Sequence, residues 1–315
     1  MDNTLYFGVD IGGTATKLGA FAENGELLAK WEIPTDPGEQ GSHILPAASA
    51  EITRYAGGDL RRVAGVGVGV PGPVLRNGMV SRCVNLHWSR FNPARELSAL
   101  LHGVPVFAGN DANVAAMGEY WQGSGQQAQS LVLVTLGTGV GSGIILDGKI
   151  VYGAHGLGGE VGHTLANPDE PLPCNCGHFG CLDQTASATG IARHAGRLLA
   201  SGDTPSTLRS LETITARDVF DAAKAGDAVA LETVELCMGF LGRSLSMLTC
   251  IIDPELFIIG GGVSKAGQFL IDVLRRHYAK EATLLDTRAD IVLATLGNDA
   301  GIYGAAKLAM DAVRR

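Results

Sequence analysis

Four potential metal ligands lie close together in the sequence, and they are His163, Cys174, Cys176 and Cys181. One imidazole and three thiolates match the number and softness of ligands in a closed, tetrahedral structural zinc site. The Cys-x-Cys spacing is tighter than in most zinc knuckles, but Gly177 and Gly180 supply the turns that bring Cys181 round. Redox-active thiols and a cysteine-bearing loop without a ligand are the alternatives. We expect Zn²⁺, because crowded thiols in a reducing compartment favour a metal over disulfides.

Three glycine-rich turns each follow a predicted strand, and they are Asp10-Ile11-Gly12-Gly13-Thr14, Gly137-Thr138-Gly139 and Gly260-Gly261-Gly262. Glycine removes the side chain that would block a phosphate, and exposed backbone amides can donate to it. The Thr14 hydroxyl can donate as well, and Lys17 lies near the first turn. One such turn is equally typical of a tight hairpin, but three in one chain favour a nucleotide site.

A neighbouring amide and carboxylate, Asn110 and Asp111, follow a short predicted strand and begin a predicted helix. Ligands gather at the carboxyl ends of strands in α/β sheets. An Asn side chain can donate to and accept from a polyol, and an Asp can take a hydroxyl proton. Helix capping by Asp111 is the structural alternative, and it explains the acidic residue without requiring the Asn before it.

One arrangement of elements occurs twice, from Leu5 to Leu28 and from Leu131 to Val151. Each copy reads as strand, glycine-rich turn, strand, tight hairpin and strand, with hairpin signals at Asn24-Gly25 and Asp147-Gly148. Chance similarity between two glycine-rich hairpins is the alternative. We expect two related α/β lobes that each bring a glycine-rich turn to the same ligand.

The other predicted elements alternate between strands and helices along the chain. We expect further strands at 63–70, 104–108, 256–259 and 291–294. We expect helices at 111–121, 185–200, 216–224, 228–250, 265–277 and 300–313. The long apolar helix at 228–250 is predicted to be a core helix, and the last helix is predicted to fold back on the first lobe.

Length and composition indicate a two-domain protein of the cytoplasm. A chain of 315 residues with 46% hydrophobic content exceeds one small core. The formal net charge of -8 is spread in short mixed runs, so we expect neither a nucleic-acid nor a membrane partner. The first residues lack the basic start and apolar run of a signal peptide, which favours the cytoplasm.

These motifs, with several others, resemble the ROK family of sugar kinases and repressors within the actin and sugar-kinase superfamily. The likeness covers essentially the whole chain and is specific at Glu160-x-x-His163 and at the Cys-x-Cys-Gly-x-x-Gly-Cys segment. The chain is particularly similar to the bacterial glucokinases of the family. The matching segments are 10–14 with Lys17, 71–74, 85–88, 110–113, 136–143, 158–163, 174–183 and 260–264.

The resemblance implies an α/β fold with two ribonuclease H-like lobes of the actin and sugar-kinase type and an active-site cleft between them. Residues 1–120 would form the small N-terminal lobe, and a helix at about 300–315 would pack back on it. Residues 121–299 would form the large lobe, which carries the zinc-binding loop. The resemblance also suggests a homodimer.

The resemblance also implies a role for each matching residue. Asp111 would be the catalytic base, and Asp10 would help to hold Mg²⁺, directly or through water. The residues around ATP would be Asp10, Gly12, Gly13, Thr14, Lys17, Thr138, Gly139, Gly261 and Gly262. The sugar would contact Gly72, Asn85, Asn110, Asp111, Glu160, His163 and Asp183. His163 would present one ring nitrogen to zinc and the other to sugar, which fixes its tautomer.

The implied activity is transfer of the ATP γ-phosphoryl group to the 6-hydroxyl of a hexose, with glucose favoured. Mannose, fructose, N-acetylglucosamine and N-acetylmannosamine are alternative acceptors. The family usually carries Glu at position 183, so Asp183 leaves the hexose open, whereas Gly109, where similar glucokinases carry Glu, is expected to matter less. Some ROK proteins are sugar-responsive repressors with a helix-turn-helix domain before the first glycine-rich turn. Because nine residues precede Asp10, we expect an enzyme rather than a repressor.

Overall fold

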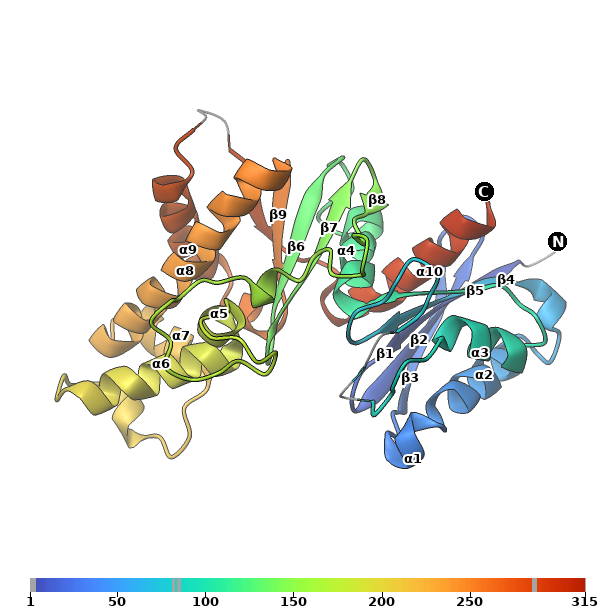
Figure 1. Cartoon of the computed structure of the whole chain (residues 1–315), viewed down its shortest axis with the longest axis horizontal. Coiled ribbons are helices and arrows are strands. Elements are labelled where there is room, and N and C mark those ends of the chain that lie inside the picture. Colours follow the sequence, from blue (N-terminus) through green and yellow to red (C-terminus); the bar gives the residue numbers. More distant parts are fainter. Residues whose placement is uncertain (1–3, 81–82, 84–85, 285–287, 315) are drawn as a thin grey trace. The chain divides into compact units, whose positions relative to one another are not determined.

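The computed structural model describes residues 4–80, 83, 86–284 and 288–314, which form two five-stranded sheets (Figure 1). The strand order is β3-β2-β1-β4-β5 in the first sheet and β10-β9-β6-β7-β8 in the second. The strands of the first sheet are β1 Leu5–Ile11, β2 Ala15–Ala22, β3 Leu27–Pro34, β4 Val63–Val70 and β5 Val106–Asn110. Those of the second are β6 Leu131–Leu136, β7 Val140–Leu146, β8 Lys149–Ile150, β9 Leu256–Gly260 and β10 Asp290–Leu293.

The two sheets repeat one topology, which confirms the predicted duplication. In the first sheet β1, β2 and β3 pair antiparallel, and β4 and β5 continue the sheet in parallel. In the second sheet β7 and β8 pair antiparallel, and β9 and β10 continue it in parallel from β6. The second hairpin turns at Asp147 and Gly148, whose φ angles are 49° and 70°. Two successive positive φ angles match the turn that suits a two-residue hairpin.

Ten α-helices and several short 3₁₀ turns connect the strands within the described ranges. The helices are α1 Gly38–Gly41, α2 Ile44–Tyr55, α3 Pro93–Leu100, α4 Asp111–Gln122, α5 Asp183–Ala186, α6 Ala188–Ser201, α7 Ala216–Lys224, α8 Ala228–Ile252, α9 Gln268–Glu281 and α10 Ala300–Val313. The sequence patterns predicted α7 and α10 at these bounds and did not identify α2 or α3.

The chain divides into two compact units. The first contains 1–127, 143–159 and 295–315, and the second contains 128–142 and 160–294. Helix α10 belongs to the first unit and packs against β1 and β4. The lobe boundaries expected at 120/121 and 299/300 stay a prediction.

Alternating side chains of β1 give the first unit two hydrophobic layers. Leu5, Phe7 and Val9 are buried in one cluster with residues of α2 and α3. Tyr6, between them, is buried in another cluster with residues of α10. Figure 1 shows α2 and α3 on one face of this sheet and α10 on the other. Alternate side chains of β1 thus pack on opposite faces of the sheet. The sheet, covered on both faces, is a rigid support for the polar residues at the ends of β1 and β5.

Two predicted helices have different bounds in the structure. The helix expected at 265–277 begins at Gln268, because Gly267 has a φ of 73° and ends a preceding 3₁₀ turn at Gly262–Ala266. The helix expected at 185–200 is two helices, α5 and α6. Ser187 lies between them in an extended conformation, and its hydroxyl caps α6 by accepting from the Gly190 N–H at 3.0 Å.

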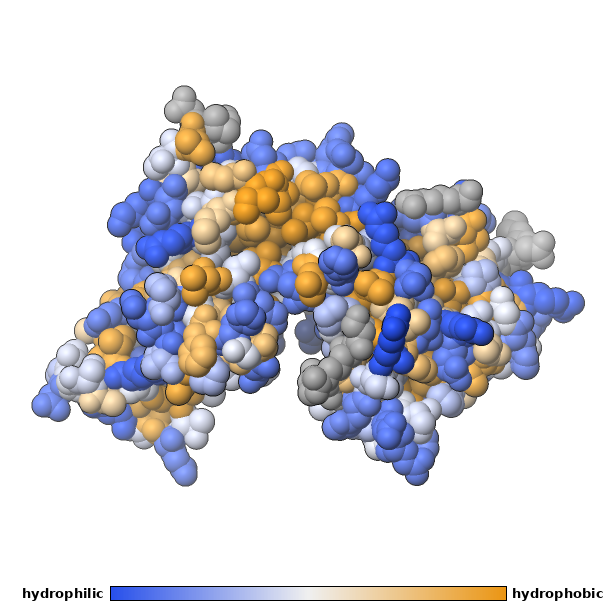
Figure 2. Space-filling model, viewed as in Figure 1, coloured by the Kyte–Doolittle hydropathy of each residue, from blue (hydrophilic) through white to orange (hydrophobic). Residues whose placement is uncertain are grey.

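Helix α8 is the one candidate membrane span found in the part of the chain that the structure describes, judged by length and composition alone. The core helix of a soluble protein has the same length and composition. Helix α8 packs against α6, α7 and α9, as a core helix does. In the view of Figure 2, hydrophilic residues are interspersed with hydrophobic ones over the helices of the second unit.

Candidate active site

In the first unit, Asn110 and Asp111 lie where β5 ends and α4 begins. Asn110 caps α4, because its Oδ1 accepts from the Asn113 N–H at 3.0 Å. The alternative in which Asp111 serves only as the helix cap is therefore wrong, because Asn110 is the cap and Asp111 is the first helical residue. Asp111 Oδ1 accepts from the Ala112 N–H at 2.8 Å and from Asn110 Nδ2 at 3.0 Å. Asn110 Nδ2 also donates to the Gly72 carbonyl at 3.1 Å, which links three predicted sugar-site residues.

Asp10 and Lys17 face one another across the first hairpin, where their Cα atoms are register partners in β1 and β2. Burial raises the pKa of the Asp10 carboxyl from 3.8 to about 6, and the Lys17 charge opposes this rise. Lys17 Nζ donates to the Asn298 carbonyl at 2.9 Å. A carboxylate whose charge is disfavoured by burial is suited to meet a cation.

The first glycine-rich turn is held by backbone hydrogen bonds. The Gly12 N–H donates to the Ala15 carbonyl at 3.0 Å, and the Thr14 carbonyl accepts from the Thr35 N–H at 3.0 Å. Gly13 is exposed, and a Cβ there would meet no atom within 4 Å. The turn thus presents open backbone next to Asp10. Asn85, which is also predicted to contact the sugar, lies outside the described residues.

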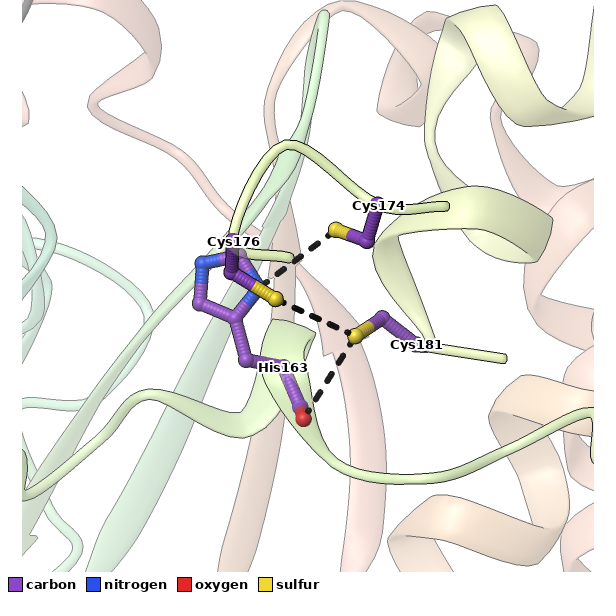
Figure 3. Close-up of side chains that lie close together, drawn as sticks. All are labelled: His163, Cys174, Cys176 and Cys181. Carbon is purple, nitrogen blue, oxygen red and sulfur yellow. Dashed lines mark hydrogen bonds between the residues drawn. The ribbon is translucent and has the colours of Figure 1, made fainter. Parts of the chain in front are cut away.

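In the second unit, the four predicted metal ligands converge (Figure 3). The ligand atoms of His163, Cys174, Cys176 and Cys181 all lie within 4.8 Å of one another. Cys174 Sγ is 3.8 Å from His163 Nδ1, and Cys176 Sγ is 3.6 Å from Cys181 Sγ. A tetrahedral zinc with Zn–S bonds of about 2.3 Å requires S–S separations of about 3.8 Å. A disulfide would need about 2.05 Å. The donor set and its spacing therefore fit Zn²⁺.

The sulfur ligands differ in burial. Cys174 and Cys181 are buried, and Cys176 is exposed. Burial, together with the two neighbouring thiols, raises the pKa of the Cys181 thiol to about 12. A metal binds the thiolate and must displace this proton, so metal binding would weaken as the pH falls.

Glu160 directly precedes the 3₁₀ turn Val161–His163 that carries the imidazole. Its carbonyl accepts from the His163 N–H at 3.1 Å. Burial raises the pKa of the Glu160 carboxyl, and the charge of His163 opposes this rise. The structure thus places the two predicted sugar-binding side chains on one short turn.

Asp183 contacts the second glycine-rich turn. Its Oδ1 accepts from the Val140 N–H at 2.7 Å. The same oxygen would lie 2.6 Å from a Cβ on Gly139. Asp183, predicted for the sugar, is therefore also in contact with the turn predicted for the nucleotide.

The third glycine-rich turn borders a cavity of about 580 Å³ in the second unit. Gly261 has a φ of 81°, and a Cβ there would lie 2.5 Å from the Leu136 carbonyl oxygen, so glycine is required. Gly262 lines the cavity, whose other lining residues are Ala188, Thr215, Ala216, Arg217, Phe220, Asp221, Val263, Lys265 and Ala266. The cavity is large enough for a small organic ligand.

The sequence patterns did not predict the roles of two sets of residues. The start of α7 was predicted as a helix, but no pattern indicated that Thr215, Arg217 and Phe220 line a cavity. Glu119 of α4 is fully buried and accepts from the Leu296 N–H at 2.8 Å and the Ser124 N–H at 3.0 Å. The available signal was a Glu within a predicted helix of mostly apolar residues.

Known proteins are similar to this chain over nearly its whole length. A sequence profile of the ROK family matches residues 6–312. A glucokinase of Halalkalibacterium halodurans is 40% identical over 314 residues, covering 96% of this chain and 94% of that protein. A solved ROK hexokinase from Thermus thermophilus is 31% identical, covers 99% of each chain and has a TM-score of 0.84. A solved ROK family glucokinase from Streptomyces griseus, in complex with glucose and AMPPNP, is 34% identical, with 98% and 99% of the two chains covered and a TM-score of 0.79. These similarities confirm the predicted α/β fold of the actin and sugar-kinase type.

Proposed function

This chain belongs to the ROK family, and from that premise we propose that it is an ATP-dependent glucokinase that phosphorylates the 6-hydroxyl of glucose. The observation that carries the proposal is the 40% identity to a glucokinase over nearly the full length of both chains. The geometry of each unit supports it. A polar pair suited to a hydroxyl substrate lies at the end of β5, and glycine-rich turns suited to phosphate lie in both units.

In this proposal Asp111 is the general base. Its Oδ1 already accepts from the Ala112 N–H and from Asn110 Nδ2, so the carboxylate is fixed in orientation before the sugar binds. Asp111 takes the proton of the attacking hydroxyl, while Asn110 and Gly72 hold neighbouring hydroxyls. Phosphoryl transfer depends mainly on alignment and charge stabilisation, so orientation of the acceptor is the main task of these residues.

The nucleotide is assigned to the three glycine-rich turns. Thr14 and Lys17, with Gly12 and Gly13, bind phosphate oxygens in the first unit. Thr138 and Gly139 do so in the second. Gly261 and Gly262 border the cavity of about 580 Å³, which we assign to the base and ribose. Asp10 would hold Mg²⁺, which neutralises phosphate charge when bound, and its raised pKa fits a carboxylate that ionises beside a cation.

Zn²⁺ is proposed at the cluster of His163, Cys174, Cys176 and Cys181, in a structural role. Four protein ligands complete a tetrahedron, which leaves no position for a substrate. Because His163 follows Glu160 on one turn and Cys181 precedes Asp183 by two residues, the metal would hold both sugar-binding segments in place.

The choice of acceptor depends on Asp183. Asp183 carries its carboxylate one methylene nearer the main chain than the Glu usual in the family, so a water can bridge it to the sugar. Mannose, fructose, N-acetylglucosamine or N-acetylmannosamine is therefore the alternative acceptor.

We further propose a cytoplasmic homodimer without nucleic-acid or membrane partners, supported by the family resemblance and the net charge of -8.

A hexose panel assayed with ATP and Mg²⁺ tests the proposal directly. We expect the highest kcat/KM with glucose and formation of glucose 6-phosphate. A higher kcat/KM with another hexose would replace glucose by that acceptor. Absence of phosphorylation of every hexose in the panel would refute the kinase assignment.

A further inference from the structure

The second glycine-rich turn is held in place by a single following segment of the chain. Asp183 Oδ1 accepts from the Val140 N–H at 2.7 Å. The Ala188 N–H donates to the Gly137 carbonyl at 2.8 Å, and Thr189 Oγ1 donates to the Thr138 carbonyl at 2.5 Å. Residues 183–189 thus bind three backbone groups within four consecutive residues of the turn.

Close packing at Gly139 adds to these hydrogen bonds. A Cβ at this position would lie 2.6 Å from Asp183 Oδ1, a distance that real Cβ contacts essentially never show. The φ angle of Gly139 is not positive, so backbone conformation does not require glycine here, and any added side chain would have to displace the Asp183 carboxylate. The carboxylate of Asp183 therefore occupies the place that any other side chain at 139 would fill.

The segment that holds the turn is itself anchored at the metal cluster. The Leu182 N–H donates to the Thr164 carbonyl at 3.0 Å, and the Leu182 side chain is fully buried. Cys181 lies immediately before it and is one of the four clustered ligands. The main chain at Asp183 is consequently fixed on both sides, by the cluster and by α5.

We propose that Asp183 is a positioning residue for the phosphate-binding turn 137–140, so that nucleotide affinity depends on this carboxylate even without sugar. The inference rests on the proposed function, in which this turn binds ATP. A carboxylate has two oxygens, so one can hold the turn while the other meets a sugar hydroxyl. Asp183 in this way joins the sugar site to the nucleotide turn within the second unit.

The physical reason is preorganisation. Without the hydrogen bond from the Val140 N–H to Asp183, the turn would sample other conformations. The nucleotide would then bind only the fraction of molecules whose turn has the binding conformation. Hydrogen bonds to charged groups are among the stronger ones, so we expect about a tenfold loss of nucleotide affinity. Simple repulsion between carboxylate and phosphate makes the opposite prediction, which is tighter binding once the charge is removed.

The test measures AMPPNP binding in MgCl₂ without sugar, by isothermal titration calorimetry, on the full-length protein. We expect Asp183→Ala to bind AMPPNP about tenfold more weakly, and Asp183→Asn to stay within about threefold of wild type because its Oδ1 can still accept from Val140. Glu160→Gln is the matched control, since Glu160 is assigned to the sugar alone. This variant should lose glucose affinity and keep wild-type AMPPNP affinity.

A double-mutant cycle with Gly139→Ala distinguishes an effect that acts through the contact between Asp183 and the turn from a direct effect on the bound phosphate. If the added methyl acts by pushing against the Asp183 carboxylate, Gly139→Ala should weaken AMPPNP binding in wild type and have a much smaller effect in Asp183→Ala. Equal effects in both backgrounds would overturn the inference, as would unchanged or tighter AMPPNP binding by Asp183→Ala. Failure of the kinase assignment is distinguished by the hexose panel on wild type, which does not depend on these variants.

Discussion

Replacement of Asp111 by Asn tests the proposed base with little change in structure. Two hydrogen bonds that orient the carboxylate, from the Ala112 N–H at 2.8 Å and from Asn110 Nδ2 at 3.0 Å, end on Oδ1. An Asn side chain can keep both, because its amide oxygen also accepts. The variant therefore loses the negative charge and the ability to take a proton, while the start of α4 is retained.

A positioned general base contributes about 10²- to 10⁴-fold to rate, which corresponds to about 2.7 to 5.5 kcal/mol of barrier. We expect Asp111→Asn to lower kcat by this factor and to leave the glucose dissociation constant within a few-fold of wild type. Steady-state kinetics with a coupled assay, read beside calorimetric titration of glucose, measures both. A kcat within tenfold of wild type would refute the assignment of Asp111 as the base. Loss of glucose affinity with unchanged kcat would make it a binding residue instead.

Three further predictions concern stability and metal. At pH 7, Asp10→Asn should raise the free energy of unfolding by up to about 3 kcal/mol, since the pKa of Asp10 is raised to about 6 from 3.8 and one pKa unit is about 1.4 kcal/mol. The folded state binds this proton more tightly, so the cost of ionisation grows between pH 4 and 6 and the gain should vanish near pH 4 in denaturant titrations. Cys176→Ser should reduce zinc below one ion per chain, raise the glucose KM and lower the Tm, and a wild type that is fully active without zinc would contradict the structural role. Glu119→Gln should lower the free energy of unfolding by about 2 kcal/mol or more, because an amide NH₂ would face N–H donors that are buried, and an unchanged denaturation midpoint would contradict this.

Periodicity and turn residues predicted the parts of the fold that local chemistry determines. The duplicated strand, turn and hairpin arrangement was readable because Asn24-Gly25 and Asp147-Gly148 are dipeptides that hairpin turns prefer. Helix α9 begins three residues later than expected, since the apolar pattern runs back through Gly267, whose left-handed conformation breaks the helix. The patterns were also insufficient for α2 and α3, which cover one face of the first sheet.

The cluster of potential metal ligands was the most predictable part of the site. Its chemistry is carried by residue types that are unusual together, and residues 163–181 lie close enough in sequence for the ligands to meet. The cavity beside Gly262 was not predictable, because its lining comes from the starts of α6 and α7 and from the turn at 262–266, and only tertiary packing brings them together. The contact of Asp183 with Val140 has the same cause, since 43 residues separate them.

Two carboxylates of the first unit, the fully buried Glu119 and the partly buried Asp10, show how environment separates a structural from a functional role. Glu119 is fully buried, yet Ser124, Thr295 and Leu296 donate to it, and it thereby ties α4 to the segment that leads into α10. Asp10 has burial as the main influence on its pKa, with Lys17 only partly compensating. A carboxylate whose charge is desolvated and only partly balanced by a partner lowers the free energy of unfolding. Such a cost is typical of a group retained for its chemistry. The contrast favours Asp10, and not Glu119, as the carboxylate that meets a cation.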